Sequence, residues 1–489
     1  MAPEKKAIEG VEWRINVGDG SSKSLVEEER FATRIWLGIK SLILKFLIFF
    51  KKARDIGAND PRKIAHCVKV GMALSVVSLF YYVRPLYDGV GGNAMWAIMT
   101  VVVVFENTVG ATICKCLNRV CGTSLAGMLA FGVHWVATKS GEKFEPLIVG
   151  ASIFMLASAA TFSRFIPSVK QRFDYGAMIF ILTFSLITVS GYRVDKLFEM
   201  AHDRISTIIV GTSLCIFVSM LICPIWAGRD LHTLTTTNMD KLANSLDGCV
   251  AEYFNSNESD EESDKKILGY KCVLSSKASE ESMANFAKWE PAHGNFGFKH
   301  PWKQYPKIGA SMRNCAYCIE ALTSCILSEN QAPDLIKNQL RDVCLKVSST
   351  SSTVIRELST TIKTMKRSSD IDFLSEETSI AVEELQETLR TLSNLHNPPI
   401  NIGAETNSAA ADETDATLVP LIEVIPLVTF ASLLIEITTR IKGIVNAVDE
   451  LANLAEFKVE ADENCDKSRS NNRVEQDLDE KTMKTLQKV

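Results

Sequence analysis

The chain has 489 residues, of which 46% are hydrophobic and 23% are charged, and its formal net charge is -5 at pH 7. This length predicts about two to four domains, and the acidic balance excludes a chain-wide basic surface of the kind that binds nucleic acid. The mean hydropathy of +0.08 is high for a soluble protein and low for one embedded in lipid throughout. We therefore expect a membrane part joined to a soluble part, and no nucleic-acid partner.

The N-terminal segment, residues 1–60, begins without the apolar core of a cleavable signal peptide. Residues 31–50 then place large apolar side chains at helical spacing, with lysines along the same stretch: Trp36, Ile39, Ile43, Phe46, Leu47 and Phe50, with Lys40 and Lys45. This mixture favours an amphipathic helix that lies in the cytoplasmic interface of the membrane. A further membrane span is the alternative.

Six apolar stretches follow, and each is long enough for a bilayer whose hydrocarbon core of about 30 Å needs about 20 helical residues. They are residues 64–83, 93–109, 118–137, 145–162, 173–191 and 203–223. Short connections with Gly, Pro or charge separate them. We therefore predict an all-α membrane protein with six transmembrane helices in a domain over residues 61–228.

Lysines and arginines near the ends of the spans predict the orientation, because cytoplasmic loops carry an excess of them. Eleven lie on the side that holds both termini: Lys51, Lys52, Arg54, Arg62, Lys63, Lys115, Arg119, Arg164, Lys170, Arg172 and Arg229. Five lie on the other side: Arg84, Lys139, Lys143, Arg193 and Lys196. Both termini are therefore predicted to be cytoplasmic.

In residues 229–460 the apolar residues recur at helical spacing and no longer form continuous runs. This pattern predicts a C-terminal cytoplasmic helical bundle. Two helices stand out, one with Ile308, Met312, Cys315, Ile319, Leu322 and Ile326, and one with Val382, Leu385, Leu389 and Leu392. Residues 418–438 resemble a span, but Glu423 and Glu436 would lack partners in lipid. A buried helix is favoured there, and its surplus apolar surface favours a homodimer in which the bundles take part.

Three segments have the polar composition of disordered chain, namely the start of the chain, an insert over residues 397–417 and the tail 461–489. Residues 255–264 form an acidic loop in which Ser259 and Ser263 are possible targets of a regulatory kinase. Solvation alone is the simpler interpretation of these two serines.

No metal or cofactor site is predicted. Cys315 and Cys318 form a C-x-x-C pair, with His293 and His300 upstream, a combination that would suit zinc. The two cysteines fall within an amphipathic helix, and the two histidines fall in an aromatic Pro/Gly loop, residues 289–305, that we interpret as a packed structural clasp. Buried reduced thiols are the favoured interpretation, and no motif of a known enzyme class is present.

Cations inside or bordering the spans are the strongest functional signal, because ionisable groups in lipid tend to face a protein interior or an aqueous path. They are Lys69, Arg84, Lys115, Arg119, Arg164, Lys170 and Arg172. An interior position is favoured for Lys69, Arg84 and Arg119. For the others, snorkelling to cytoplasmic headgroups is the competing interpretation. A path lined by cations would attract anions.

Two further residues of the predicted second span can be interpreted in more than one way. Glu106 would pair with one of the cations and fix helix packing, which we favour over a proton-relay role. Trp96 lies at the start of the span and would be an interfacial anchor or a constriction of the path, and the anchor is favoured.

The motifs in these regions resemble those of the plant aluminium-activated malate transporter (ALMT) family of anion channels. They are residues 93–106, Val109-Gly110-Ala111-Thr112, Leu117-Asn118-Arg119, Phe173-Asp174-Tyr175-Gly176, Trp289-Glu290-Pro291, His293-Gly294, Phe296, His300-Pro301-Trp302, Tyr305 and Gly309. The resemblance covers roughly residues 61–323 and is far more specific than the number of spans alone.

The resemblance implies a homodimer with six spans per subunit and a cytoplasmic helical domain. It also implies voltage-dependent, malate-modulated passive flow of malate, chloride, nitrate and sulfate across the plasma membrane, or alternatively the vacuolar membrane. Lys69, Arg84, Arg119 and Arg164 match cationic positions expected along the conduction path of the family. The quick-activating guard-cell branch is the most similar one. The scattered external carboxylates Asp88, Glu142 and Glu145 do not predict a site for a trivalent metal.

The sequence therefore predicts an anion channel and not an enzyme. A proton-coupled exporter of organic or aromatic acids is the first alternative, with Glu106 as the proton-coupling group. A membrane-anchored scaffold whose function lies in the soluble bundle is the second.

Overall fold

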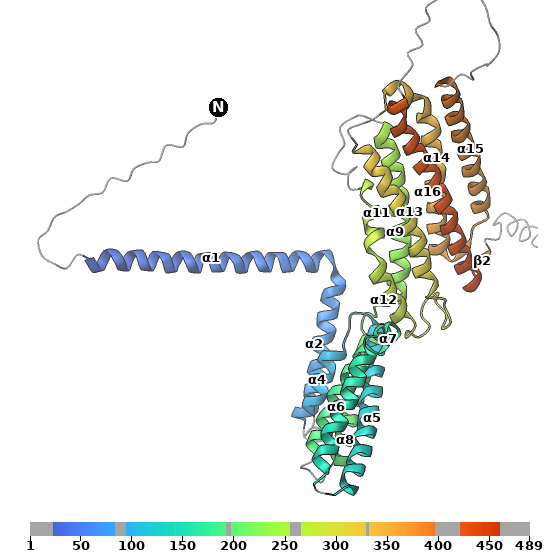
Figure 1. Ribbon diagram of the computed structural model, residues 1–489. Coiled ribbons are helices and arrows are strands. Elements are labelled where there is room, and N and C mark those ends of the chain that lie inside the picture. Colours follow the sequence, from blue (N-terminus) through green and yellow to red (C-terminus); the bar gives the residue numbers. More distant parts are fainter. Residues whose placement is uncertain are drawn as a thin grey trace, which may run out of the picture. The chain divides into compact units, whose positions relative to one another are not determined.

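The computed structural model describes residues 23–83, 94–141, 143–191, 197–254, 266–328, 332–396 and 421–459. These residues are helical almost throughout, with a single pair of two-residue strands among them (Figure 1). The chain divides into two compact units, Met1–Val68 and Lys69–Val489, and each is described by itself. The predicted disordered segments and the acidic loop with Ser259 and Ser263 lie outside the described residues.

The first unit contains α1 (Lys23–Asn59), a helix of 37 residues. The predicted interfacial stretch, residues 31–50, falls inside α1, and the helix extends beyond it at both ends. The large apolar side chains from Trp36 to Phe50 stay exposed, with 65% of Trp36 and 63% of Phe50 accessible to solvent. This exposure is compatible with a helix that lies on a lipid surface, which remains a prediction.

The boundary between the two units falls within α2 (Pro61–Tyr82), and the next five helices of the described ranges belong to the second unit. They are α4 (Ala94–Val104), α5 (Val109–Lys139), α6 (Glu145–Ser163), α7 (Pro167–Gly191) and α8 (Leu197–Leu221). α5 packs against α7 and α8, α4 packs against α8, and α6 packs against α7. α5 therefore has neighbours on more than one side and occupies a central position among these helices.

Five helices in the described ranges are long and apolar enough to cross a membrane, which makes this an all-helical membrane protein. They include α5, α6, α7 and α8, which match predicted spans, and the stretch Val424–Leu454. α2 is not among the five, and α4, with 11 residues, is only about 16 Å long. The structure thus gives about five candidate spans, where the sequence predicted six.

The predicted second span, residues 93–109, breaks at Glu106. The backbone N–H of Glu106 donates to the side-chain oxygen of Thr112 at 3.1 Å and does not continue α4. Thr108 then caps α5, because its side chain accepts a hydrogen bond from the backbone N–H of the third helical residue. As a result Lys115, which falls between the predicted spans 93–109 and 118–137, lies inside α5 together with Arg119.

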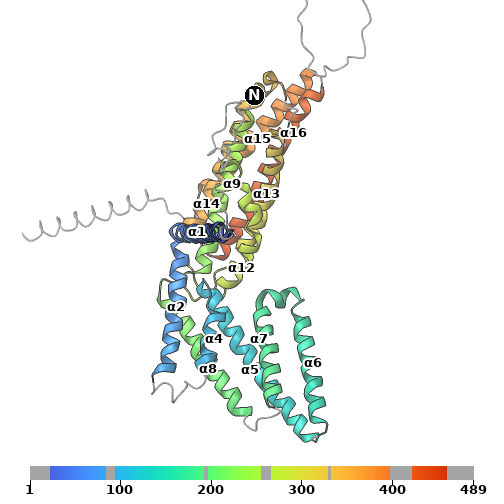
Figure 2. The ribbon, with the colours of Figure 1, turned by 90° about the vertical axis from the view of Figure 1, so that its left-hand side faces the viewer.

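The C-terminal helices form a second group within the same unit, in which α9, α13, α14 and α16 run side by side (Figures 1 and 2). The bounds are α9 (Ala227–Phe254), α11 (Tyr270–Ser275), α12 (Lys277–Ala287), α13 (Gln304–Ile326), α14 (Asp334–Thr364), α15 (Asp370–His396) and α16 (Leu421–Leu454). The helical periodicity predicted for α13 is confirmed, because Ile308, Met312, Cys315, Ile319 and Leu322 are fully buried. Each such large apolar side chain stabilises the fold by about 1.5–3 kcal/mol.

α16 overlaps the apolar stretch 418–438 that was predicted to be a buried helix. It packs against α13 and α14, and Leu427, Phe430 and Leu434 are fully buried in their common core. Much of the apolar surface of this stretch is therefore covered within the domain. It is a weaker reason to expect a dimer than the sequence suggested.

Two short strands join the ends of α14 and α16. β1 (Lys366–Arg367) and β2 (Lys458–Val459) pair in parallel, with Lys366 opposite Lys458. Each helix is followed by a residue other than glycine in the left-handed region, Met365 directly after α14 with φ 52° and Glu456 two residues after α16 with φ 54°. These turns bring the two chain segments into register immediately after their helices.

Candidate functional site

Arg119 lies within α5 and is only 9% exposed. Its Nη1 donates a hydrogen bond to the hydroxyl oxygen of Tyr175 on α7 at 3.1 Å. Its Nε is buried and has no hydrogen-bond partner in the described part of the chain. None of the carboxylates in that part forms an ion pair with its guanidinium. Arg119 is therefore a buried cation whose charge the described residues do not neutralise.

Lys115 lies one turn before Arg119 on the same helix, and its charge is neutralised. Its ammonium group forms an ion pair with Glu106, the acid that the sequence singled out. The ammonium also lies 5.5 Å from the ring centroid of Tyr175, a cation–π distance. We call Glu106, Lys115, Arg119 and Tyr175 the Arg119 cluster.

Arg204 on α8 is a fourth charged residue at this cluster, and it was not predicted from the sequence. Its guanidinium lies 3.8 Å from the ring centroid of Trp96 on α4, and its charge interacts with that of Arg119. The cation–π contact joins α4 to α8 and places Trp96 against a cation, beyond the two roles considered for it. No local motif marks Arg204, because its partners lie on other helices.

Lys69, another predicted pathway residue, is buried elsewhere. Its side chain is 1% exposed, and its Nζ donates to the backbone carbonyl of Cys223 at 2.9 Å. This bond ties α2 to the chain that follows α8. The structure therefore gives Lys69 a contact that stabilises helix packing.

The remaining predicted cations do not join the Arg119 cluster. Arg164 donates from Nε and Nη2 to the two carboxylate oxygens of Asp174, at 2.7 and 3.3 Å, so its charge is neutralised. The Arg172 side chain is exposed, and its backbone carbonyl accepts a hydrogen bond from Asn118 at 3.0 Å. Arg84 lies outside the described residues.

Glu290 fixes the helix that carries the cluster. Its carboxylate accepts hydrogen bonds from the backbone N–H groups of Gly110 at the start of α5 (3.2 Å) and of Ala227 and Gly228 at the start of α9 (2.6 and 3.0 Å). Burial raises the pKa of Glu290, and these N–H groups oppose the shift. One carboxylate thus caps two helix N-termini, where unpaired N–H groups favour negative charge.

The aromatic loop 289–305 packs around this carboxylate. His293 stacks on Trp226 at 4.0 Å between ring centroids. The Tyr305 hydroxyl lies within hydrogen-bond distance of His232 at 3.0 Å and of His300 at 3.1 Å. Burial lowers the pKa of both of these histidines to about 4, so they are neutral near pH 7. Within the described ranges no three His, Cys, Asp or Glu side chains gather as a metal site.

The arrangement as a whole defines a class of protein. Membrane-length helices surround a buried, unneutralised guanidinium, and a carboxylate from the C-terminal helical domain holds the helix that carries it. Such an arrangement fits a membrane transport protein, because intramembrane cations that face a protein interior mark paths for anions.

The comparisons with known proteins agree with this class. The family model described as "Aluminium activated malate transporter" (ALMT) matches residues 54–416 and 393–452. The chain is 54% identical over 471 residues to "Aluminum-activated malate transporter 10" of Arabidopsis thaliana, which covers 92% of this chain and 95% of that protein. It is 40% identical over 426 residues to "Aluminum-activated malate transporter 1" of Triticum aestivum, which covers 84% and 86%, respectively. The chain therefore belongs to the ALMT family, as its motifs predicted, and is not an enzyme.

Proposed function

We propose that this protein is an anion channel that conducts malate and small inorganic anions such as chloride, nitrate and sulfate passively across a plant membrane. Arg119 is the observation that carries the proposal. A guanidinium stays charged at physiological pH and can bind a carboxylate through two N–H groups. Tyr175 accepts from one nitrogen of Arg119, so other N–H groups remain available to a passing anion.

The neighbouring polar groups support a hydrated path beside Arg119. The hydroxyl of Thr123, one turn further along α5, is buried and has no hydrogen-bond partner in the described ranges. Buried polar groups without protein partners are usually satisfied by water or a ligand. An anion that leaves bulk water could form hydrogen bonds with such groups in place of some of those it made to water. Because a single unneutralised arginine binds it, the anion would be held weakly enough to leave again.

The proposed topology has the six crossing segments that the sequence predicts, residues 64–83, 93–109, 118–137, 145–162, 173–191 and 203–223, in a domain over residues 61–228. It places residues 1–60 and the helical domain 229–460 in the cytoplasm together with both termini. Its support is the excess of Lys and Arg on one side and the packing of α16 inside the C-terminal core. We also propose a homodimer. α6 packs against α7 but has no fully buried residue, so the side of α6 that faces away from α7 could contact lipid or a second copy of the chain.

Several finer properties rest on the family resemblance and the sequence. They are membership of the quick-activating guard-cell branch, voltage dependence, modulation by malate, location in the plasma membrane and regulation by a kinase. For the exporter alternative, the pairing of Glu106 with Lys115 favours a packing role over proton coupling. Nothing in the described ranges favours the exporter or the scaffold.

Current recordings with stepwise exchange of anions on each side of the membrane test the proposal. We expect currents whose reversal potential follows the anion equilibrium potential and does not move when a proton gradient is imposed. A reversal potential that shifts with the proton gradient would favour the coupled exporter. Absence of any current from protein that reaches the membrane would favour the scaffold.

A further inference from the structure

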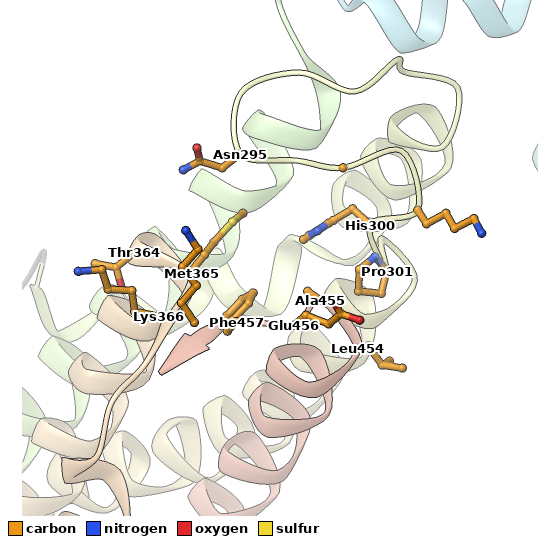
Figure 3. A pocket seen from close by; sticks show the side chains of 13 residues that line it. Asn295, His300, Pro301, Thr364, Met365, Lys366, Leu454, Ala455, Glu456 and Phe457 are labelled. Carbon is orange, nitrogen blue, oxygen red and sulfur yellow. The ribbon is translucent and has the colours of Figure 1, made fainter. Parts of the chain in front are cut away.

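A pocket of about 580 Å³ lies in the C-terminal helical domain, away from the Arg119 cluster. Three segments that are distant in sequence form it: the loop from Asn295 to Pro301, the end of α14 with β1, and the end of α16 with β2. Figure 3 shows these segments around the pocket, with His300 on the loop, Met365 after α14 and Phe457 after α16. Its volume is in the range of small-molecule sites, about 300–1,000 Å³.

Three lysines and one carboxylate line the pocket: Lys299, Lys366, Lys458 and Glu456. Lys366 and Lys458 are direct partners in the parallel strand pair, so their side chains leave the strands on the same face. Like charges opposite each other destabilise a strand pair. An anion bound between them would relieve this repulsion.

The pocket lysines differ from other lysines of the same domain. Lys307, Lys346 and Lys363 each form an ion pair with a carboxylate, at 3.0, 2.7 and 2.7 Å, respectively. None of the three pocket lysines forms an ion pair with a described carboxylate, Glu456 included. Three lysine charges against the single carboxylate of Glu456 therefore leave this pocket with a net positive charge.

The backbone at the pocket is held in an uncommon conformation. Met365 and Glu456 both line the pocket and both have a left-handed backbone, with φ values of 52° and 54°. Residues other than Gly, Asn and Asp rarely adopt this region, and such residues concentrate at ligand sites and switch regions. The turns at Met365 and Glu456 lead into the strand pair that sets Lys366 opposite Lys458.

The lining also indicates the chemical class of the ligand. Lysine ammonium groups act as compact point charges that suit phosphate, whereas bidentate recognition of a carboxylate is typical of arginine. The adjacent Arg367 is directed to Asn453 and Asp449, at 3.0 and 4.0 Å. Met365 and Phe457 add an apolar wall against which an organic body can pack. We propose that this pocket binds a soluble organic polyphosphate, with its phosphates on Lys299, Lys366 and Lys458.

The same loop connects the pocket to the membrane helices. It supplies Asn295, His300 and Pro301 to the pocket, and five residues before Asn295 it supplies Glu290, whose carboxylate binds the start of α5. A ligand that orders this loop would therefore act on the helix that carries Arg119. This consequence for current rests on the proposed function, whereas binding itself does not.

Calorimetric titration of the purified full-length protein tests the site, with inositol hexakisphosphate and adenosine triphosphate as probes. We expect the parent to bind at least one of these polyphosphates more tightly than citrate, with an affinity that falls as salt is raised. The Lys366→Gln/Lys458→Gln protein should bind at least about tenfold more weakly, and Lys442→Gln, on α16 outside the pocket, should bind like the parent. Failure of both probes to bind, citrate binding of equal strength, or an equal loss in Lys442→Gln would overturn the proposal.

Current recordings distinguish a failure of the proposed polyphosphate site from a failure of the proposed channel function. The probe that binds, applied to the face that holds the C-terminal domain, should change the current of the parent and leave that of the Lys366→Gln/Lys458→Gln protein unchanged. A current that does not respond in the parent would overturn the link through the loop. Binding without any parental current would leave the pocket established and contradict the proposed channel function.

Discussion

Two arginines, Arg119 in the membrane helices and Arg313 in the C-terminal helical domain, are buried to the same extent, at 9% and 8% exposed, but their surroundings differ. Arg313 donates to the carboxylate of Glu280 at 2.7 Å, and Ser276 donates to the same carboxylate at 2.6 Å. Arg119 has the neutral hydroxyl of Tyr175, and its Nε has no partner in the described part of the chain.

This difference indicates different roles for the charges of Arg313 and Arg119. A buried charge is costly unless it is paired, and the C-terminal domain satisfies this rule inside its own fold. The Arg119 cluster does not satisfy it, because its one carboxylate, Glu106, pairs with Lys115. An unneutralised charge persists when function requires it, and under the proposed function the process that uses this charge is anion conduction.

The largest effect is expected where a buried charge loses its partner. Glu280→Gln leaves the Arg313 guanidinium buried beside a neutral amide, and we expect the free energy of unfolding to fall by about 3–5 kcal/mol. Thermal unfolding of the full chain in detergent measures this. The control is Glu436→Gln, whose partner Arg440 is half-exposed, and it should change stability by no more than about 0.5 kcal/mol. Equal stability of the two variants would contradict a structural role for the Glu280–Arg313 pair.

Acid should destabilise the C-terminal domain through its buried histidines. The pKa of His232 and of His300 is lowered from 6.5 to about 4 in the fold. Between these pH values the unfolded chain binds protons that the folded chain does not, so stability falls as the pH falls from about 6.5 to about 4. The loss should amount to about 2 kcal/mol per histidine by pH 5.

Thermal unfolding followed over this pH range measures the effect, with the His232→Gln protein as the comparison. The variant should show a shallower decline, because one titrating group has been removed. An unchanged pH slope would show that His232 does not titrate as its burial requires.

Removal of the hydroxyl that holds Arg119 should have the smallest effect. Tyr175→Phe deletes one hydrogen bond between membrane helices, and such bonds contribute about 0.6 kcal/mol on average in a membrane protein. We expect anion current at matched surface expression to fall about threefold, because the guanidinium is less well positioned. Tyr317→Phe, on the exposed side of α13, is the control and should conduct like the parent. Equal currents from both variants would argue against a positioning role for Tyr175.

Local patterns predicted the helices well. The spacing of Ile308, Met312 and Cys315 identified α13, because a buried helix face places apolar residues three or four positions apart in the sequence. The break after α4 was not predictable in this way. It depends on a hydrogen bond from the backbone N–H of Glu106 to the side-chain oxygen of Thr112. The composition of this stretch is that of one continuous apolar helix.

The site was predictable only in part for the same physical reason. Arg119 and Glu106 stood out because charge in an apolar stretch is a local signal. Arg204 and Glu290 gained their meaning from distant partners, the ring of Trp96 and the backbone N–H of Gly110. Contacts between residues that are far apart in the chain produce no regular spacing pattern in a single sequence. Only the fold shows them.

The central claim is that the unneutralised guanidinium of Arg119 serves anion conduction. The most direct test is the anion current of Arg119 variants, measured at matched surface expression. We expect Arg119→Ala to lower the anion current at least about tenfold, equivalent to ~1.4 kcal/mol of lost anion stabilisation, and Arg119→Lys to restore part of it by returning the charge without the guanidinium fork. Lys143→Ala, which removes an exposed cation next to the start of α6, should conduct like the parent. An Arg119→Ala protein that reaches the membrane and conducts like the parent would contradict the account.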